Sequence, residues 1–255
     1  MAEPAIKTSG LSKSFGGLHA VKDLNLEIPP GEIFGFLGPN GAGKTTTVKL
    51  LTGLMAPTRG KAWIHGRDIS ENPIAVKKTI ALVPDEPFVY PKLTGIEFMR
   101  LVGGLYEVPL EKQKSKIPEL LEMFDLKDRA MEILESYSHG MRQKLVFASV
   151  LLHEPRVLFL DEPMVGLDPK SAKMVKEIFR RLAENGVTLF MCTHIMEIAE
   201  QLCHRVGIMI DGELIAVGTL DEIKKQSRRE GFNLEEAFLT LTGNLEVTAR
   251  SKRLD

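Results

Sequence analysis

The chain has 255 residues, 44% of them hydrophobic and 26% charged, which is an ordinary composition for a globular protein. Its 33 basic and 34 acidic residues give a formal net charge of −1, so no overall positive field attracts nucleic acid, and none is expected as a partner. No apolar run approaches the roughly 20 residues that span a bilayer, so we expect any membrane role to need another chain.

The first part of the chain predicts two kinds of β-structure. Residues 4–30 and 60–70 alternate loosely between polar and apolar, which predicts an N-terminal antiparallel β-subdomain. Between them, the apolar run at 33–37 predicts a buried strand that enters a glycine-rich turn. A helix is expected over about 44–52.

The middle of the chain is predicted to be helical. A buried strand is expected at 80–84, but the region from about 88 to 152 contains no convincing strand. Helix-like periodicity occurs instead at 94–106, 111–124 and 139–152. We interpret this region as an α-helical subdomain inserted between two strands of the core.

Two further buried strands and a hairpin complete the core. The runs at 156–160 and 187–192 are typical of strands covered on both faces. Asp211-Gly212 lies between two apolar runs, which is a strong hairpin signal. Alternating strands and helices of this kind predict an α/β fold with a mainly parallel sheet.

A phosphate-binding loop lies between the strand at 33–37 and the helix after it. The pattern G-x-x-x-x-G-K-[ST] is matched by Gly38, Pro39, Asn40, Gly41, Ala42, Gly43, Lys44 and Thr45. Glycines let backbone N–H groups point at phosphate oxygens, and the helix N-terminus adds its positive dipole end. Lys44 can reach the β- and γ-phosphates, Thr45 can ligate Mg²⁺, and Thr46 offers a further donor. The motif predicts a P-loop NTPase core that binds ATP and Mg²⁺; the alternative is a chance glycine turn.

Acidic residues and a histidine follow two of the predicted strands. Asp161 and Glu162 end the strand at 156–160, and His194 follows the strand at 187–192. The carboxyl edge of a parallel sheet is where such folds bind ligands. Asp161 is placed to hold Mg²⁺ and Glu162 to activate water as a general base, while His194 can orient this machinery. Taken alone, these residues also fit surface acids and a histidine beside a helix cap.

The segment from Tyr137 to Lys144 resembles the signature sequence of ABC transporters, Leu-Ser-Gly-Gly-Gln in its commonest form. It precedes the carboxylate strand, and Gly166-Leu167-Asp168 and His194 follow in the family's order. With the phosphate loop, this ordered set is similar to an ABC nucleotide-binding subunit over roughly residues 4 to 220. The isolated segment also fits a simple serine N-cap.

The resemblance implies a head-to-tail dimer in which two ATP molecules lie between one subunit's phosphate loop and the partner's signature. Ser138, His139 and Gly140 would then contact the ATP of the partner subunit, and Asp168 would couple the two sites. Phe15 falls where the family places an aromatic ring that stacks on adenine; a core aromatic is the alternative. The resemblance makes a homodimer the expected assembly. It places one ATPase domain at 1–243, followed by a flexible tail at 244–255.

Two departures from the family pattern point to one branch of it. Asp85 stands where the family usually has a glutamine that ligates Mg²⁺ and senses the membrane partner. His139 and Met141 replace a glycine and the glutamine of the signature. These features, and a short closing helix expected at 233–238, resemble bacterial exporter-type subunits.

The expected function is ATP hydrolysis that drives a separate transmembrane permease, at the cytoplasmic face of the membrane. The resemblance implies that the permease docks near residues 85–105. One alternative is an ABC-type ATPase that acts on nucleic acid or ribosomes, although no tandem domain or zinc module is visible. A nucleotide-binding scaffold with little catalysis is the other, and the presence of Glu162 and His194 argues against it.

Overall fold

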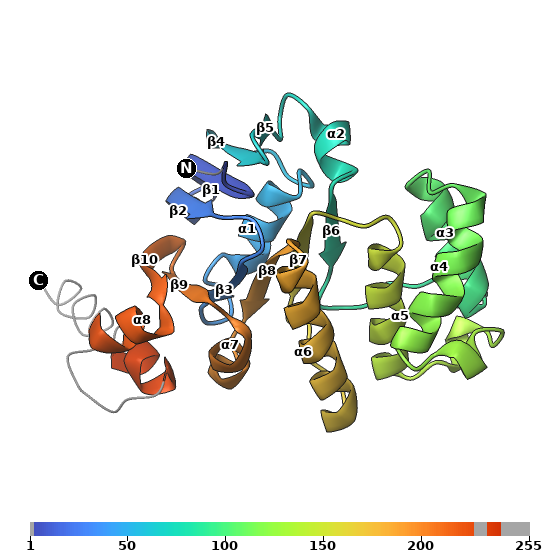
Figure 1. Cartoon of the computed structure of the whole chain (residues 1–255). Helices are drawn as coiled ribbons and strands as arrows, with labels where there is room; N and C mark the ends of the chain where they lie inside the picture. The colour runs from blue at the N-terminus through green and yellow to red at the C-terminus, as the bar shows by residue number, and fades with distance from the viewer. Residues whose placement is uncertain (1–2, 227–233, 241–255) are drawn as a thin grey trace, which may run out of the picture.

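The structure, a computed structural model, describes residues 3–226 and 234–240. It contains two β-sheets with helices packed around them (Figure 1). The larger sheet has the strand order β10-β9-β3-β8-β7-β6. Its strands are β3 (Ile33–Leu37), β6 (Ile80–Val83), β7 (Val157–Asp161), β8 (Thr188–Thr193), β9 (Arg205–Ile210) and β10 (Glu213–Thr219).

The centre of the larger sheet confirms the predicted buried parallel strands. Every residue of β3, β7 and β8 is buried, as expected where both faces of a sheet are covered. β8 pairs in parallel with both β3 and β7, so the carboxyl ends of these three strands meet at one edge. That edge holds the phosphate loop, Asp161 and Thr193.

The smaller sheet confirms the predicted antiparallel subdomain. Its order is β2-β1-β4-β5, and the three pairs it contains are antiparallel. Its strands are β1 (Ile6–Phe15), β2 (Leu18–Ile28), β4 (Arg59–Ile64) and β5 (Arg67–Asp68). A shared apolar core joins this sheet to α1 and to one face of the larger sheet, through side chains such as Phe34, Phe36 and Phe190.

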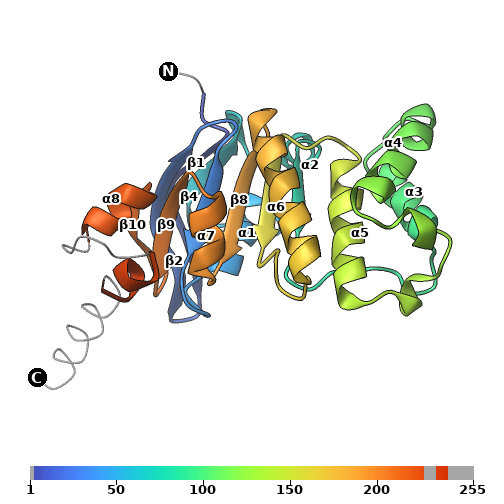
Figure 2. The same ribbon diagram turned by 60° about the horizontal axis from the view of Figure 1, so that its bottom comes forward.

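Three helices form a group between β6 and β7 in the sequence, within the predicted insertion. Figures 1 and 2 both place them at one end of the molecule, opposite β10 and α8. Their packing joins the core that lines the other face of the sheet. The helices are α3 (Gly95–Leu105), α4 (Leu110–Met123) and α5 (His139–Leu151), with short 3-10 turns η1 (Lys127–Arg129) and η2 (Leu134–Ser136).

Each of the remaining labelled helices follows a strand directly in the sequence. They are α1 (Lys44–Leu51), α2 (Pro73–Lys77), α6 (Pro169–Glu184), α7 (Met196–Leu202) and α8 (Leu220–Gln226). Residues 234–240 are also helical, which covers most of the predicted closing helix; Asn233 and the predicted tail at 244–255 lie outside the described residues. Among the helices described, none is long and apolar enough to cross a bilayer.

The predicted hairpin is confirmed. Asp211 and Gly212 have φ angles of 47° and 83° between the antiparallel strands β9 and β10. Two successive positive φ angles are typical of the type I′ turn that matches strand twist. The turn also touches the phosphate loop, because the Gly212 N–H donates to the Ala42 carbonyl at 3.0 Å.

His153 ties the helical group to the core. Its ring stacks on Tyr106, the C-cap of α3, with centroids 3.7 Å apart, and its Nε2 lies 3.0 Å from the Ile80 carbonyl of β6. The other ring nitrogen, Nδ1, is buried without a partner. Burial lowers the pKa of His153 below its ordinary value of 6.5.

This geometry predicts a loss of stability in mild acid. Below pH 6.5 the unfolded chain binds a proton at residue 153 that the folded chain resists, so stability falls as the pH drops through that value. We expect His153→Phe to shrink the difference in unfolding free energy between pH 7 and pH 5, measured by urea denaturation. Tyr106→Phe keeps the histidine and is the control. An unchanged difference in His153→Phe would refute the assignment.

Candidate functional site

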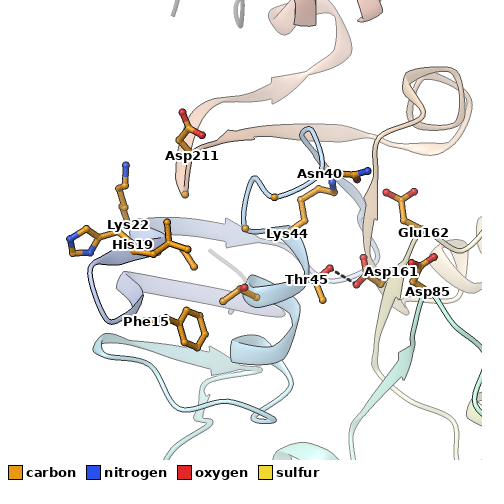
Figure 3. Close-up of a pocket in the computed structure, with 16 residues that line it drawn as sticks. Phe15, His19, Lys22, Asn40, Lys44, Thr45, Asp85, Asp161, Glu162 and Asp211 are labelled. Carbon is orange, nitrogen blue, oxygen red and sulfur yellow. Dashed lines mark hydrogen bonds between the residues drawn. The ribbon is translucent and has the colours of Figure 1, made fainter. Parts of the chain in front are cut away.

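A cavity of about 650 Å³ opens beside the phosphate loop (Figure 3). It brings together residues from β1, the phosphate loop, α1 and the ends of β6 and β7. The predicted site residues that line it are Phe15, Asn40, Gly41, Gly43, Lys44, Thr45, Thr46, Asp85, Asp161 and Glu162. Gly38, Pro39 and Ala42 belong to the loop but do not line the cavity.

The phosphate loop depends on glycine where it turns into α1. Gly43 has a φ of 109°, and a Cβ there would lie 2.2 Å from the Ala20 carbonyl oxygen. An added Cβ at Gly41 would meet nothing within 4 Å, so the loop is open on that side. No side chain caps the N-terminus of α1. Its backbone N–H groups are thus available to an anion in the cavity.

Lys44 is buried at the base of the loop, with only 6% of its surface exposed. Its ammonium donates to the Gly38 carbonyl at 2.7 Å and the Pro39 carbonyl at 3.1 Å. An ammonium has three protons to donate, so one remains for a ligand. The loop therefore holds a positive charge in place beside the space for an anion.

Thr45 and Asp161 meet across the edge of the sheet, although 116 positions separate them. The Thr45 hydroxyl donates to Asp161 Oδ2 at 2.9 Å, the contact drawn in Figure 3. Burial raises the pKa of Asp161, and the nearby carboxylates of Glu162 and Asp85 raise it further. A divalent cation would relieve this repulsion.

The donors at this point suit a hard cation. Carboxylate and hydroxyl oxygens are the ligands that Mg²⁺ takes, with the remaining positions filled by substrate phosphates and water. In the described part of the chain, no group of three or more His, Cys, Asp or Glu side chains forms a complete metal site. The side chains of Thr45, Asp161 and Asp85 therefore fit Mg²⁺ that arrives together with a nucleotide.

Glu162 is held at both carboxylate oxygens. The Thr193 hydroxyl donates to Oε2 at 3.0 Å, and the His194 N–H donates to Oε1 at 3.1 Å. The imidazole Nδ1 of His194 lies 2.7 Å from the same Oε1. Glu162 has a φ of 46°, a strained conformation for a non-glycine residue that often marks a functional site. His194 does not line the cavity itself and contacts it only through Glu162.

The signature segment lies away from this cavity. Ser138 caps α5 by accepting from the Met141 N–H at 3.3 Å, as the simple N-cap interpretation predicts. Gly140 and His139 pack instead against the loop after β7: a Cβ added to Gly166 would fall 2.4 Å from His139 Cδ2. Among the residues that line the cavity, none comes from 138–140.

Asp168 is exposed at the start of α6, which it caps. It accepts from the Ser171 hydroxyl at 2.6 Å and from the N–H groups of Lys170 and Ser171 at 2.9 and 3.1 Å. The hydrogen bonds from Ser171 lower the pKa of the Asp168 carboxyl. This capping role was not predicted from the sequence, and the coupling role of Asp168 stays a prediction.

Four polar or flexible positions around the cavity were missed by sequence reasoning. His19 and Lys22 of β2, and Asp211 and Gly212 of the hairpin, also line it. Figure 3 shows His19, Lys22 and Asp211 on the side opposite Asp85, Asp161 and Glu162. The Asp211-Gly212 signal predicted only a turn. The β2 residues carry no motif, and only their closeness to Phe15 in the sequence hints at their place.

Comparison with known proteins gives a consistent result. The ABC transporter family matches residues 21–165. The daunorubicin/doxorubicin resistance ATP-binding protein DrrA of Streptomyces peucetius is 37% identical over 98% of this chain and 81% of its own length. The bacitracin transport ATP-binding protein BcrA of Bacillus licheniformis is 37% identical over 88% of this chain and 72% of its own.

The chain belongs to the ABC transporter family. The fold agrees: the ATP-binding subunit of an ABC transporter superimposes with a TM-score of 0.88, at 32% identity, over 93% of this chain and 99% of that one. A dimeric ATP-binding cassette bound to ADP and phosphate gives 0.77 at 25% identity, over 84% and 98%. The chain is thus an ATP-binding and ATP-hydrolysing ABC subunit with a P-loop core.

Proposed function

We propose that two copies of this chain close head to tail around two Mg-ATP and thereby drive a membrane permease that exports its cargo. One observation in particular supports the proposed dimer. The signature residues Ser138, His139 and Gly140 do not line the cavity that contains Lys44. A single chain therefore holds only half of the proposed site, and a second copy would supply the other half.

The residues of one cavity fit a division of labour in hydrolysis. Lys44 and the backbone N–H groups of the loop would hold the phosphates, while Thr45, Asp161 and Asp85 would hold Mg²⁺. When bound, the cation would neutralise charge on the phosphate oxygens. Glu162 accepts a proton from the water that attacks the γ-phosphate, and His194 keeps that carboxylate oriented.

Phe15 is placed to receive the adenine. It lies on the side of the cavity opposite Asp85, Asp161 and Glu162 (Figure 3), and 46% of its surface is exposed. A core aromatic would be buried, so this exposure supports the stacking interpretation over the alternative. Its free ring face offers the offset stacking that aromatic rings prefer.

A surface patch supports docking of a permease at the cytoplasmic face of the membrane. Phe88 and Tyr90, which we call the apolar patch, are 71% and 50% exposed. The rings of Phe88 and Tyr90 meet edge to face at 5.5 Å. Large exposed apolar side chains in one region mark protein contacts. These residues follow Asp85, so a docked partner would lie close to the nucleotide.

The names of the relatives support export. They include proteins for daunorubicin resistance and for bacitracin transport. No observation on the described surface favours a role on nucleic acid or ribosomes. The net charge of −1 provides no excess of positive charge that would attract nucleic acid. Drug-like or peptide antibiotics are the cargo class that these names favour.

Capture from host membranes tests the docking proposal. We expect the chain, purified with ATP from detergent-solubilised membranes of its host, to bring a polytopic membrane protein at stoichiometric yield, identified by mass spectrometry. Phe88→Ser with Tyr90→Ser should lower that yield about tenfold or more, since interface aromatics commonly contribute 2 kcal/mol or above. The control is Leu54→Ser with Leu110→Ser, which changes equally exposed apolar residues elsewhere. Equal loss in the control would remove the apolar patch as the docking site.

A further inference from the structure

The strand that ends in Phe15 carries a lysine directly behind the ring. The Nζ of Lys13 lies 5.2 Å from the centroid of the Phe15 ring. Residues two apart on a strand share a face, which brings the two side chains together on β1. Phe15 lines the nucleotide cavity and Lys13 does not, so the ammonium lies over the ring without being part of the cavity lining.

The ammonium of Lys13 is itself fixed. It donates to the Ala56 carbonyl at 2.8 Å. That segment is tied to β1 by two more hydrogen bonds, from the Thr58 N–H to the Ser12 carbonyl at 2.8 Å and from the Ser14 N–H to the Thr58 hydroxyl at 3.1 Å. The cation is therefore in place before any nucleotide arrives.

We propose that Lys13 is a positioning residue for adenine: it holds the Phe15 ring on which the base stacks. A ring that is half exposed at the end of a strand has rotational freedom that stacking must remove. A cation fixed over one face holds the ring by a cation–π interaction and leaves the other face free for the base. This preorganisation lowers the cost of binding. The proposal rests on the nucleotide site described above and adds a residue to it.

If Lys13 positions adenine, its substitution should weaken the binding of ligands that carry the base and leave the binding of phosphates alone unchanged. Lys13→Met keeps the aliphatic stem and removes the charge, and we expect it to weaken ADP binding about two- to fivefold by calorimetry. Binding of pyrophosphate, which has the same phosphates but no base, should be unchanged in a displacement assay. Lys13→Arg should restore ADP affinity, because a guanidinium also binds an aromatic face.

Two controls separate positioning from a general charge effect. Lys7→Met removes a charge from the same strand, where Lys7 pairs with Glu27, and should leave ADP affinity unchanged. In a Phe15→Ala background, Lys13→Met should add nothing, as expected for two residues that act as one unit. Unchanged ADP affinity in Lys13→Met, an equal loss for pyrophosphate, or a full effect without Phe15 would overturn the proposal. Failure of the unmodified chain to bind ADP would instead contradict the nucleotide site itself.

Discussion

Replacing Glu162 by glutamine is expected to lower the ATPase rate about a hundredfold or more while ATP still binds. The substitution keeps the size and the hydrogen-bonding reach of the side chain, but an amide oxygen is a far weaker base than a carboxylate. General bases typically contribute 10²- to 10⁴-fold, by rough estimate. Since Lys44, Thr45 and Asp161 are untouched, the affinity for ATP should remain within about twofold. Phosphate release and equilibrium binding measure the two quantities separately.

The matched control for Glu162 is Glu197→Gln on α7. Glu197 accepts a hydrogen bond from Gln201 at 3.1 Å and does not line the cavity. The ATPase rate of the Glu197→Gln variant should equal that of the parent. If Glu162→Gln also turned over at the parental rate, Glu162 would not be the base, and the constraint imposed by Thr193 and His194 would be structural only.

Replacing Lys44 by alanine is expected to weaken ATP binding about a hundredfold. A hydrogen bond to a charged group contributes roughly 1.5–3 kcal/mol, and about 1.4 kcal/mol corresponds to a factor of ten. The loss of a buried ammonium also leaves the Gly38 and Pro39 carbonyls without their donor, which loosens the loop. Calorimetric titration with Mg-ATP measures the effect.

The control for Lys44 lies one turn and a half further along the same helix. Lys49 is exposed near the end of α1, so Lys49→Ala removes the same charge without touching the cavity. Its affinity for ATP should match the parent. Equal affinity in Lys44→Ala would mean that the loop does not bind phosphate.

Much of the fold was predictable because its signals are local. A fully buried strand needs an unbroken apolar run, and β3 and β7 both show one. The Asp211-Gly212 turn likewise depends on its own backbone angles. The meeting of Thr45 and Asp161 was inferable only because parallel strands bring their carboxyl ends to one edge.

Other contacts had no local signal. The hairpin reaches the phosphate loop through one backbone hydrogen bond, from Gly212 to Ala42, and backbone groups carry no sequence identity. Helix α6 was not predicted, although Asp168 begins it as an N-cap. The position of Lys13 behind Phe15 depends on where the Ala56 segment folds back. Contacts of this kind follow from tertiary packing, which a motif does not encode.

Light scattering of the Glu162→Gln chain shows whether ATP joins two copies of this chain. The single chain has a mass of 28.3 kDa. With Mg-ATP we expect twice that mass, and the single mass both without nucleotide and after Ser138→Arg is added to block the signature. A chain that stays at the single mass with saturating Mg-ATP bound would show that ATP does not join two copies.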